Sequence, residues 1–399
     1  MNAQHPLKVP SKMSQPKLLN ASFNQDQSCF AVCNENGFQV YSTEPMELRM
    51  RRKFQSKSGN NGIGIVSMLY RTNYVALVGG GKRPRFPVNK LCIWDDLKMK
   101  PSIFLEFMNP ILNVLLSRVR IVVITKNQVA VYAFRSQPNL ISMFETYTND
   151  SGACDLSINE SGSILAFPGR SEGQIQLADI SPENQNKNLV SIIKAHKAGI
   201  QSLCISNSGK LVASASVTGT IIRIHDTSNC ALLYEFRRGI DKALVTSMRF
   251  SPDDARLAVL SDKNTLHVYN LRDVNTGVAE KQGPTFSANK FVTDGRKRMD
   301  GESNKMHFLK GIPLLPKYFR STWSFASKNV GNRADEYKDT GVIGWSDSDT
   351  IILLWKFKGT WEKYTIVDDF SKVDPSSGDL EGKQKCTILK VAWRNITNV

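Results

Sequence analysis

The fold is decided by a stretch that the chain repeats: SFNQDQSCFAVCNENGFQVY (22–41) returns as RFSPDDARLAVLSDKNTLHVY (249–269). Each copy holds an apolar strand, a polar turn, a second apolar strand, another turn and a third strand in which apolar and polar residues alternate. Two further copies, at 157–179 and 204–226, carry the turn clusters NESG and NSGK in the same slot. This shared layout predicts a repeat protein built from β-sheets.

Looser copies occupy 66–95, 111–134 and 340–369, which brings the tally to seven units. Their spacing is close to the 40 to 45 residues of a WD-type propeller blade. A four-stranded blade cannot bury both faces alone, whereas radial packing against its neighbours supplies the missing core. We therefore predict an all-β, seven-bladed WD-repeat-type β-propeller over 18–370. A flexible segment (1–17) precedes it, and a C-terminal segment (371–399) that is a candidate for closing the propeller follows it.

One connection is far longer than the others. After the strand at 265–271 the chain runs 51 residues before WSFA (323–326), where blades normally use short turns. The end of this insertion, MHFLKGIPLLPKYF (306–319), mixes apolar side chains with lysines, a composition suited to the headgroup region of a membrane. We predict a membrane-facing loop over 272–318, with Phe308, Leu309 and Ile312 entering the interface. The alternative for 314–319 is a structural role, because these residues directly precede the strand that closes the blade.

The composition restricts the partners and the compartment. The 399 residues carry a net charge of +16, which favours a polyanionic partner such as anionic lipid, nucleic acid or an acidic protein. Seven cysteines are scattered without a C-x-x-C pair, as in a cytosolic protein with reduced core cysteines. The polar N-terminal stretch lacks the apolar region of a secretory signal, and no apolar run approaches the ~18 residues of a membrane span. Any membrane contact is therefore expected to be peripheral.

Patterns typical of catalysis or metal binding are weak. GGGKRP (79–84) lacks the G-x-x-x-x-G-K-[ST] spacing of a phosphate-binding loop, so a turn between strands is the better interpretation. Asp347 and Asp349 lie in an expected turn without a partner histidine, and no nucleophile elbow or triad is evident. We expect no enzymatic activity, no metal and no cofactor.

A pair of adjacent arginines ends the segment LLYEFRRG (232–239), which fits the outer strand of the fifth blade. Successive side chains leave a strand on opposite faces, so Arg237 and Arg238 cannot enter one pocket. Because a buried, unpaired arginine is costly, both are expected in grooves near the rim, where a guanidinium can bind phosphate in a bidentate manner. The dipeptide alone is more typical of a solvated pair at a strand end, so the context must decide.

That context is a family resemblance that covers about 18–326. The phrases FNQDQSCFAVCNENGFQVY, YVALVGGGKRPRFPVNKLCIWDD, ILAFPG, ASASVTGTIIRIHDTS, FRRG and LPKYFRSTWSFA resemble the PROPPIN family, the WIPI-like phosphoinositide-binding WD-repeat propellers. ALVGGG and KLCIWDD resemble most the short branch with the WIPI3-like and WIPI4-like members and their yeast counterpart.

The resemblance implies two lipid-binding sites on either side of the FRRG strand. The first site would hold His196, Ser216, Thr220, Arg223 and Arg237. The second would hold Arg238, Ser261, Thr265 and His267. Both sets combine cations with hydroxyl donors, which suits an inositol ring that carries phosphates and free hydroxyls.

Several of these residues have a structural alternative. A histidine at the position of His196 often joins a Ser or Thr and an Asp in a core network, but here Thr218 stands where the Asp would be, which favours ligand contact. Arg223 and His267 also fit the outward face of an alternating strand, and only the resemblance singles out the hydroxyl residues.

The resemblance implies binding to membranes that carry phosphatidylinositol 3-phosphate or phosphatidylinositol 3,5-bisphosphate, in the cytoplasm, on vacuolar, endosomal or pre-autophagosomal surfaces. It further implies recruitment of autophagy or trafficking machinery, with an autophagic lipid-transfer protein as the expected partner and Asn24 and Asp26 as its contacts. The alternative is a propeller that binds an acidic protein or nucleic acid without membrane contact. No stripe of aromatic and basic residues favours nucleic acid.

Overall fold

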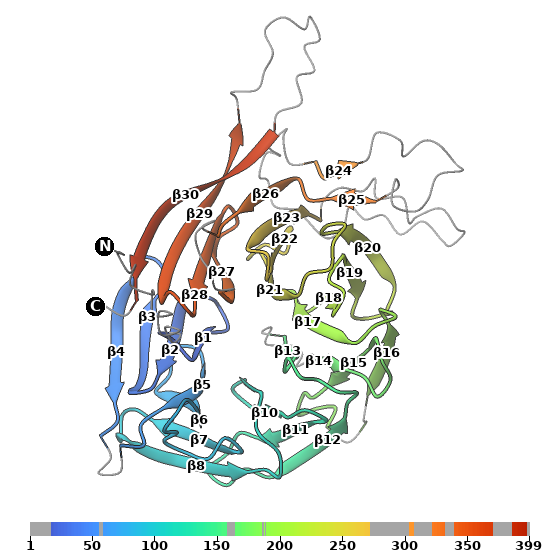
Figure 1. Ribbon diagram of the computed structural model, residues 1–399. Coiled ribbons are helices and arrows are strands. Elements are labelled where there is room, and N and C mark those ends of the chain that lie inside the picture. The colour runs from blue at the N-terminus through green and yellow to red at the C-terminus, as the bar shows by residue number, and fades with distance from the viewer. Residues whose placement is uncertain are drawn as a thin grey trace, which may run out of the picture.

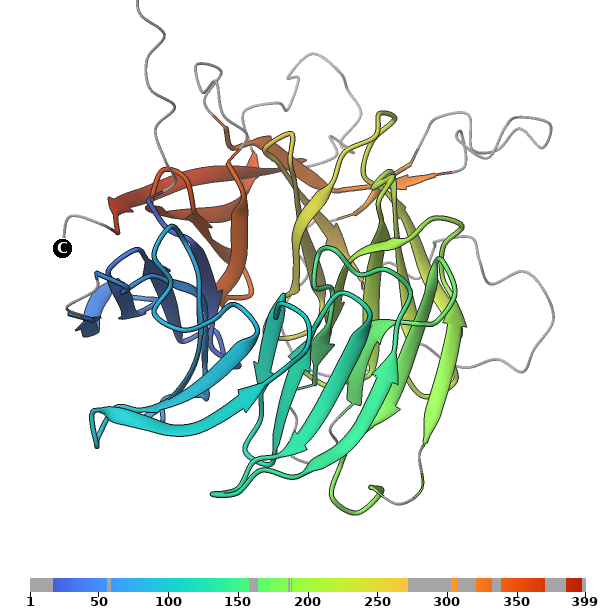
Figure 2. The ribbon, with the colours of Figure 1, turned by 60° about the horizontal axis from the view of Figure 1, so that its bottom comes forward.

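The computed structural model describes residues 17–55, 59–157, 164–185, 187, 189–271, 303–306, 321–331, 339–369 and 385–396. These residues form seven sheets that follow one another around a ring (Figure 1). Seen from a second direction, the strands of successive sheets stand side by side around the central axis (Figure 2). The predicted all-β, seven-bladed propeller is confirmed.

Each blade contains four strands that follow one another from the centre to the rim, and the sheet of blade five has two further short strands. The strands of the first three blades are β1 (Asn20–Phe23), β2 (Cys29–Asn34), β3 (Gly37–Ser42), β4 (Glu47–Lys53), β5 (Ile63–Met68), β6 (Tyr74–Gly79), β7 (Lys90–Asp95), β8 (Lys100–Glu106), β9 (Asn113–Leu116), β10 (Arg120–Ile124), β11 (Gln128–Ala133) and β12 (Leu140–Glu145). The strands of the fourth and fifth blades are β13 (Asp155–Leu156), β14 (Ile164–Pro168), β15 (Gln174–Asp179), β16 (Val190–Lys194), β17 (Ile200–Ile205), β18 (Leu211–Ser216), β19 (Ile221–Asp226) and β20 (Leu232–Arg237). The strands of the last two blades are β21 (Val245–Phe250), β22 (Arg256–Ser261), β23 (Thr265–Asn270), β26 (Ala326–Asn329), β27 (Gly341–Asp347), β28 (Thr350–Trp355), β29 (Thr360–Asp369) and β30 (Lys385–Asn395).

The core lies between the blades. Middle strands such as β22 are buried along their whole length because both faces meet a neighbouring blade. Between blades five and six, the rings of Phe236 and Tyr269 stack with their centroids 4.6 Å apart. Aromatic pairs of this kind add stability beyond the apolar area that they bury. This packing fixes the positions of neighbouring blades.

The ring closes where blade one meets blade seven. Each of these blades is built from four consecutive strands, so they share no strand. The Trp345 backbone N–H donates to Gln27 Oε1 at 2.9 Å, and the Tyr41 hydroxyl donates to the Ile396 carbonyl at 2.8 Å. Phe30 and Trp361 belong to one apolar cluster at this junction. Side-chain packing and hydrogen bonds therefore hold the ring together here.

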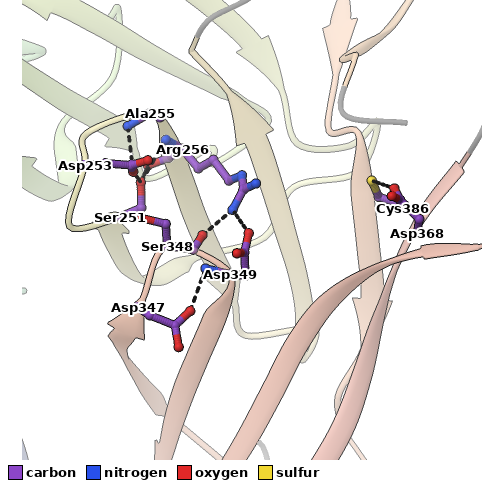
Figure 3. A network of polar contacts seen from close by, with 9 residues as sticks. All are labelled: Ser251, Asp253, Ala255, Arg256, Asp347, Ser348, Asp349, Asp368 and Cys386. Atoms are coloured by element: carbon purple, nitrogen blue, oxygen red, sulfur yellow. Dashed lines mark hydrogen bonds and ion pairs between the residues drawn. The ribbon is translucent and has the colours of Figure 1, made fainter. Parts of the chain in front are cut away.

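A polar clamp joins blades six and seven (Figure 3). The buried Arg256 side chain extends from β22 to the turn before β28, where it donates to the Ser348 carbonyl and to Asp349 Oδ1. Carboxylate and carbonyl oxygens together satisfy the guanidinium, which offsets part of the cost of its burial.

The long connection of blade six leaves the sheet after β23 and returns in β26, which pairs with β23 as its fourth strand. Two short strands within it, β24 (Lys305–Met306) and β25 (Thr322–Trp323), extend the sheet of blade five. Strand β25 runs parallel to β20, with Arg237 opposite Trp323. Residues 272–302 and 307–320 of this connection lie outside the described part of the chain.

Candidate functional site

Strand β20 separates two polar clusters, one on each side of blade five. Its register places Arg237 opposite Ile221 and Glu235 opposite Arg223, so Arg237, Glu235 and Arg223 share one face. Arg238 follows directly after the strand, and its backbone N–H donates to the Thr220 carbonyl at 2.9 Å.

The first cluster lies between blades four and five. His196, in the connection into blade five, has Nε2 3.0 Å from Ser214 Oγ. The Arg223 guanidinium donates to Glu235 Oε2 at 2.8 Å and to the Ala195 carbonyl. Because Arg223 and Glu235 are both partly exposed, with side-chain exposures of 27% and 40%, this ion pair is open to solvent and to competing anions.

The other residues predicted for the first site surround this pair less closely. Ser216 lies at the end of β18, and its hydroxyl is 2.7 Å from that of Thr218. Thr220 is half-buried in the same turn. Arg237 Nε donates to Ser321 Oγ at 3.0 Å. The structure therefore brings His196 and Arg223 together, and places Ser216, Thr220 and Arg237 at the adjoining end of the blade.

The second cluster lies between blades five and six. Arg238 is only 5% exposed, and its guanidinium donates to the Gly219 carbonyl at 2.8 Å and to the Asp241 carbonyl. His267 Nδ1 is 3.1 Å from Ser324 Oγ. The structure thus places Arg238 and His267 on the same side of β20.

Two hydroxyl residues complete the second predicted set. Ser261 is 1% exposed, and its hydroxyl is buried without a hydrogen-bond partner among the described residues. Thr265 begins β23 and lies opposite Asn329 of β26. A buried hydroxyl without a partner is costly, so Ser261 has an unused donor in this cluster.

The expectation that both arginines lie in grooves near the rim holds less well for Arg238. The burial cost that motivated the expectation applies to an unpaired charge, whereas Arg238 is paired with two backbone carbonyls. One carbonyl belongs to the turn at Gly219 and the other to the loop after Gly239, and both accept from the Arg238 guanidinium. Arg238 therefore supports the backbone here, whatever else it binds.

The histidines of both clusters are held neutral. Burial, together with the nearby Arg223 guanidinium, lowers the pKa of His196 to about 4. Burial and the Arg238 charge do the same to His267, whose pKa is also about 4. His225 on β19 has a pKa of about 4 for the same reasons, burial and Arg223. A phosphate placed between such a histidine and arginine would oppose these shifts, because a negative charge favours the imidazolium.

Three contact residues were not singled out by sequence reasoning. Ser214 rather than Ser216 bonds to His196, Glu235 pairs with Arg223, and Ser324 bonds to His267. The strand register could have indicated Glu235, since Glu235 of the LLYEFRRG strand directly opposes Arg223 of β19. Ser324 follows a long insertion, so no local spacing relates it to His267.

The residues predicted to contact a protein partner form a turn in blade one. Asn24 is buried, and its Oδ1 accepts from the Cys29 backbone N–H at 3.0 Å. Asp26 Oδ1 accepts from the backbone N–H of Ser28 at 3.0 Å. Both side chains therefore stabilise the turn between β1 and β2. Phe308, Leu309 and Ile312 of the predicted membrane loop lie outside the described residues.

The described part of the chain contains no group of three or more His, Cys, Asp or Glu side chains arranged to hold a metal ion. None of its segments is a helix long and apolar enough to cross a membrane. All seven cysteines are free, and six are buried, as expected for core cysteines.

Known proteins match this chain in sequence and in fold. The PROPPIN family model matches residues 17–294. The protein SVP1-like protein 2 of Pichia angusta is 55% identical over 394 residues, with 99% of each chain covered, and its namesake in Debaryomyces hansenii is 47% identical with both chains covered completely. The structure of Kluyveromyces lactis Hsv2 has the same fold, with a TM-score of 0.71 at 23% identity over 96% of this chain and 99% of that one. A complex of KlAtg21 with the coiled coil of AgAtg16 superposes with a TM-score of 0.66 at 20% identity, over 96% of this chain and 99% of that one.

These matches confirm the resemblance found in the sequence. The chain belongs to the PROPPIN family, whose members are phosphoinositide-binding, autophagy-related propellers that attach peripherally to membranes and are in general not enzymes.

Proposed function

We propose that this propeller binds phosphatidylinositol 3-phosphate and phosphatidylinositol 3,5-bisphosphate on vacuolar, endosomal or pre-autophagosomal membranes and recruits autophagy or trafficking machinery there. The supporting observation is the pair of clusters beside β20. Each combines an arginine with a half-buried histidine that is hydrogen-bonded to a serine, as His196 is to Ser214 and His267 to Ser324.

The chemistry of the first cluster fits a phosphate that competes with an internal acid. Glu235 binds Arg223 in the free protein, and the pair is partly exposed. A head-group phosphate carries up to two negative charges and several acceptor oxygens, so it is a stronger partner for a guanidinium than one carboxylate. His196 and the hydroxyls of Ser216 and Thr220 then supply donors for the ring.

Two weak sites on one rigid body bind a membrane more tightly than either site alone. Tethering makes the second contact intramolecular and raises affinity by about a hundredfold when the geometry permits. The net charge of +16 adds attraction to an anionic leaflet. We further propose that Phe308, Leu309 and Ile312 enter the interface and strengthen this docking.

A flotation assay with vesicles of defined composition tests the proposal. The protein should float with phosphatidylcholine vesicles that contain phosphatidylinositol 3-phosphate or 3,5-bisphosphate, and should stay at the bottom with vesicles that contain phosphatidylinositol alone. Equal flotation with phosphatidylserine vesicles of matched charge would show that the protein binds any anionic membrane and does not recognise the phosphoinositide head group. Absence of flotation would favour the alternative, a propeller that binds an acidic protein or nucleic acid.

The protein partner is proposed from the family. An autophagic lipid-transfer protein is the first candidate, and the coiled-coil partner of the Atg21 complex is a second. Asn24 is buried in its turn, so Asp26, which is exposed, is the better candidate for a direct contact.

A further inference from the structure

The loop that connects β20 to β21 presents an apolar side chain to solvent between the two clusters. Ile240 is 66% exposed, although it lies only two residues after the buried Arg238. At the neighbouring Gly239, an added Cβ would meet no atom within 4 Å, so the tip of the loop projects into open space.

This exposure belongs to an ordered loop. The Arg238 guanidinium donates to the Asp241 carbonyl, and the Ala243 backbone N–H donates to the Thr218 carbonyl at 3.3 Å. Leu244 and Asp262 exchange two hydrogen bonds, of 3.1 and 2.8 Å. The loop is thus tied to the turn of blade five on one side and to the turn of blade six on the other, which holds Ile240 at a defined position.

Two lysines lie on the same loop and on the adjoining turn. Lys242 is exposed, and Lys263 of the blade-six turn is 45% exposed and pairs with the exposed Asp241 at 3.4 Å. An exposed aliphatic side chain near lysines suits the boundary between headgroups and acyl chains, where the apolar group enters and the charges meet lipid phosphates.

We propose that Ile240 is a membrane-insertion point of its own, placed between the two lipid-binding clusters and held there by Arg238. The inference rests on the proposed lipid binding and adds a contact that neither cluster nor the long connection of blade six provides. On this view Arg238 has a second role beside the head-group site: its buried guanidinium fixes the loop whose tip enters the bilayer.

The experiment uses a fluorescent label at the tip. Cys230 is the one partly exposed cysteine among seven, so Cys230→Ser gives a background in which an added cysteine is labelled selectively. Ile240→Cys carries an NBD dye, and Leu97→Cys carries it in the control. Leu97 is 83% exposed in the β7–β8 turn of blade two. That turn lies on the opposite face of the ring, because β-strands of one blade alternate in direction.

On vesicles of phosphatidylcholine and phosphatidylinositol 3-phosphate, the dye at position 240 should brighten and shift to the blue, whereas the dye at position 97 should not change. Ile240→Asp should weaken vesicle binding about tenfold or more, given the value of burying an aliphatic side chain, and leave affinity for soluble inositol 1,3-bisphosphate unchanged. Leu97→Asp should change neither.

The outcomes separate this inference from the proposed function. A silent dye at position 240 on vesicles that bind the protein overturns the insertion point and leaves lipid binding intact. A fall in soluble head-group affinity equal to the fall in vesicle affinity also overturns it, because Ile240 would then support a pocket. Failure of the unlabelled protein to bind these vesicles overturns both proposals.

Discussion

The two clusters beside β20 use the same histidine–serine pair but satisfy their arginines differently. Arg223 between blades four and five is paired with the side chain of Glu235 at a partly exposed position. Arg238 between blades five and six is buried and paired with two backbone carbonyls. A carboxylate can rotate away from its partner, whereas the carbonyls of a packed turn cannot. The partner of Arg223 is therefore exchangeable, whereas Arg238 also supports the fold.

The largest expected effect tests the framework role of Arg238. Arg238→Thr should lower the free energy of unfolding by about 3 kcal/mol, because the buried Gly219 carbonyl and the partly buried Asp241 carbonyl lose their donor and a cavity remains. Arg237→Thr is the matched control and should cost less than about 1 kcal/mol, since Arg237 is only partly buried. Urea unfolding measures both. Similar losses for the two variants would remove the distinction between them.

The next effect concerns exchange at Arg223. Arg223→Ala should reduce the stoichiometry of soluble head-group binding from two to one, as measured by calorimetry. Glu235→Gln should tighten binding at that site several-fold, because the guanidinium loses its internal competitor while the side chain keeps its size. Weaker binding by Glu235→Gln would mean that Glu235 orients Arg223 for the ligand. A wild-type stoichiometry of one would contradict the model of two sites.

Near neutral pH the smallest effect is the protonation of the histidines, which makes stability depend on pH and sharpens the comparison of the two clusters. The folded pKa values of His196 and His267, about 4, lie below the ordinary value of 6.5. The unfolded chain therefore takes up protons first, and stability should fall as the pH decreases from about 6.5 to about 4. The slope is at most ~1.4 kcal/mol per pH unit for each histidine.

The control for this effect is a pair of single variants, His196→Asn and His267→Asn. Each should flatten the dependence of unfolding free energy on pH, and bound head group should reduce it for whichever histidine lies beside a phosphate. Unchanged slopes in both variants would show that other groups govern acid stability.

The blades were predictable because their signal is local. The stretch 249–269 showed two apolar strands and an alternating third strand, and these are β21, β22 and β23. The outer strand LLYEFRRG was recognised as β20 from its position after such a unit. The role of residues 385–395 as the outer strand of blade seven was less evident, because 15 residues outside the described part, 370–384, separate them from β29.

The sequence indicated which residues belong to the candidate site better than it indicated their hydrogen-bond partners and burial. Alternation along a strand correctly separates Arg237 from Arg238, since it depends on geometry alone. The depth of burial of Arg238 depends on how two distant turns meet, and no pattern in FRRG encodes it. Which serine of β18 contacts His196, Ser214 or Ser216, depends in the same way on tertiary packing. It is set by where the β16–β17 connection crosses β18.

The junction between blades one and seven has a consequence for the synthesis of the chain. Gln27 bonds to Trp345, 318 positions later, and Phe30 is covered by an apolar cluster that includes Trp361. At the ~5–20 residues per second of translation, roughly 15 to 60 s separate the two halves of this contact. Throughout that interval the face of blade one that packs against blade seven is complete but uncovered. Exposed apolar surface of this kind is an aggregation hazard. The nascent propeller therefore leaves this face uncovered for longest at its oldest blade.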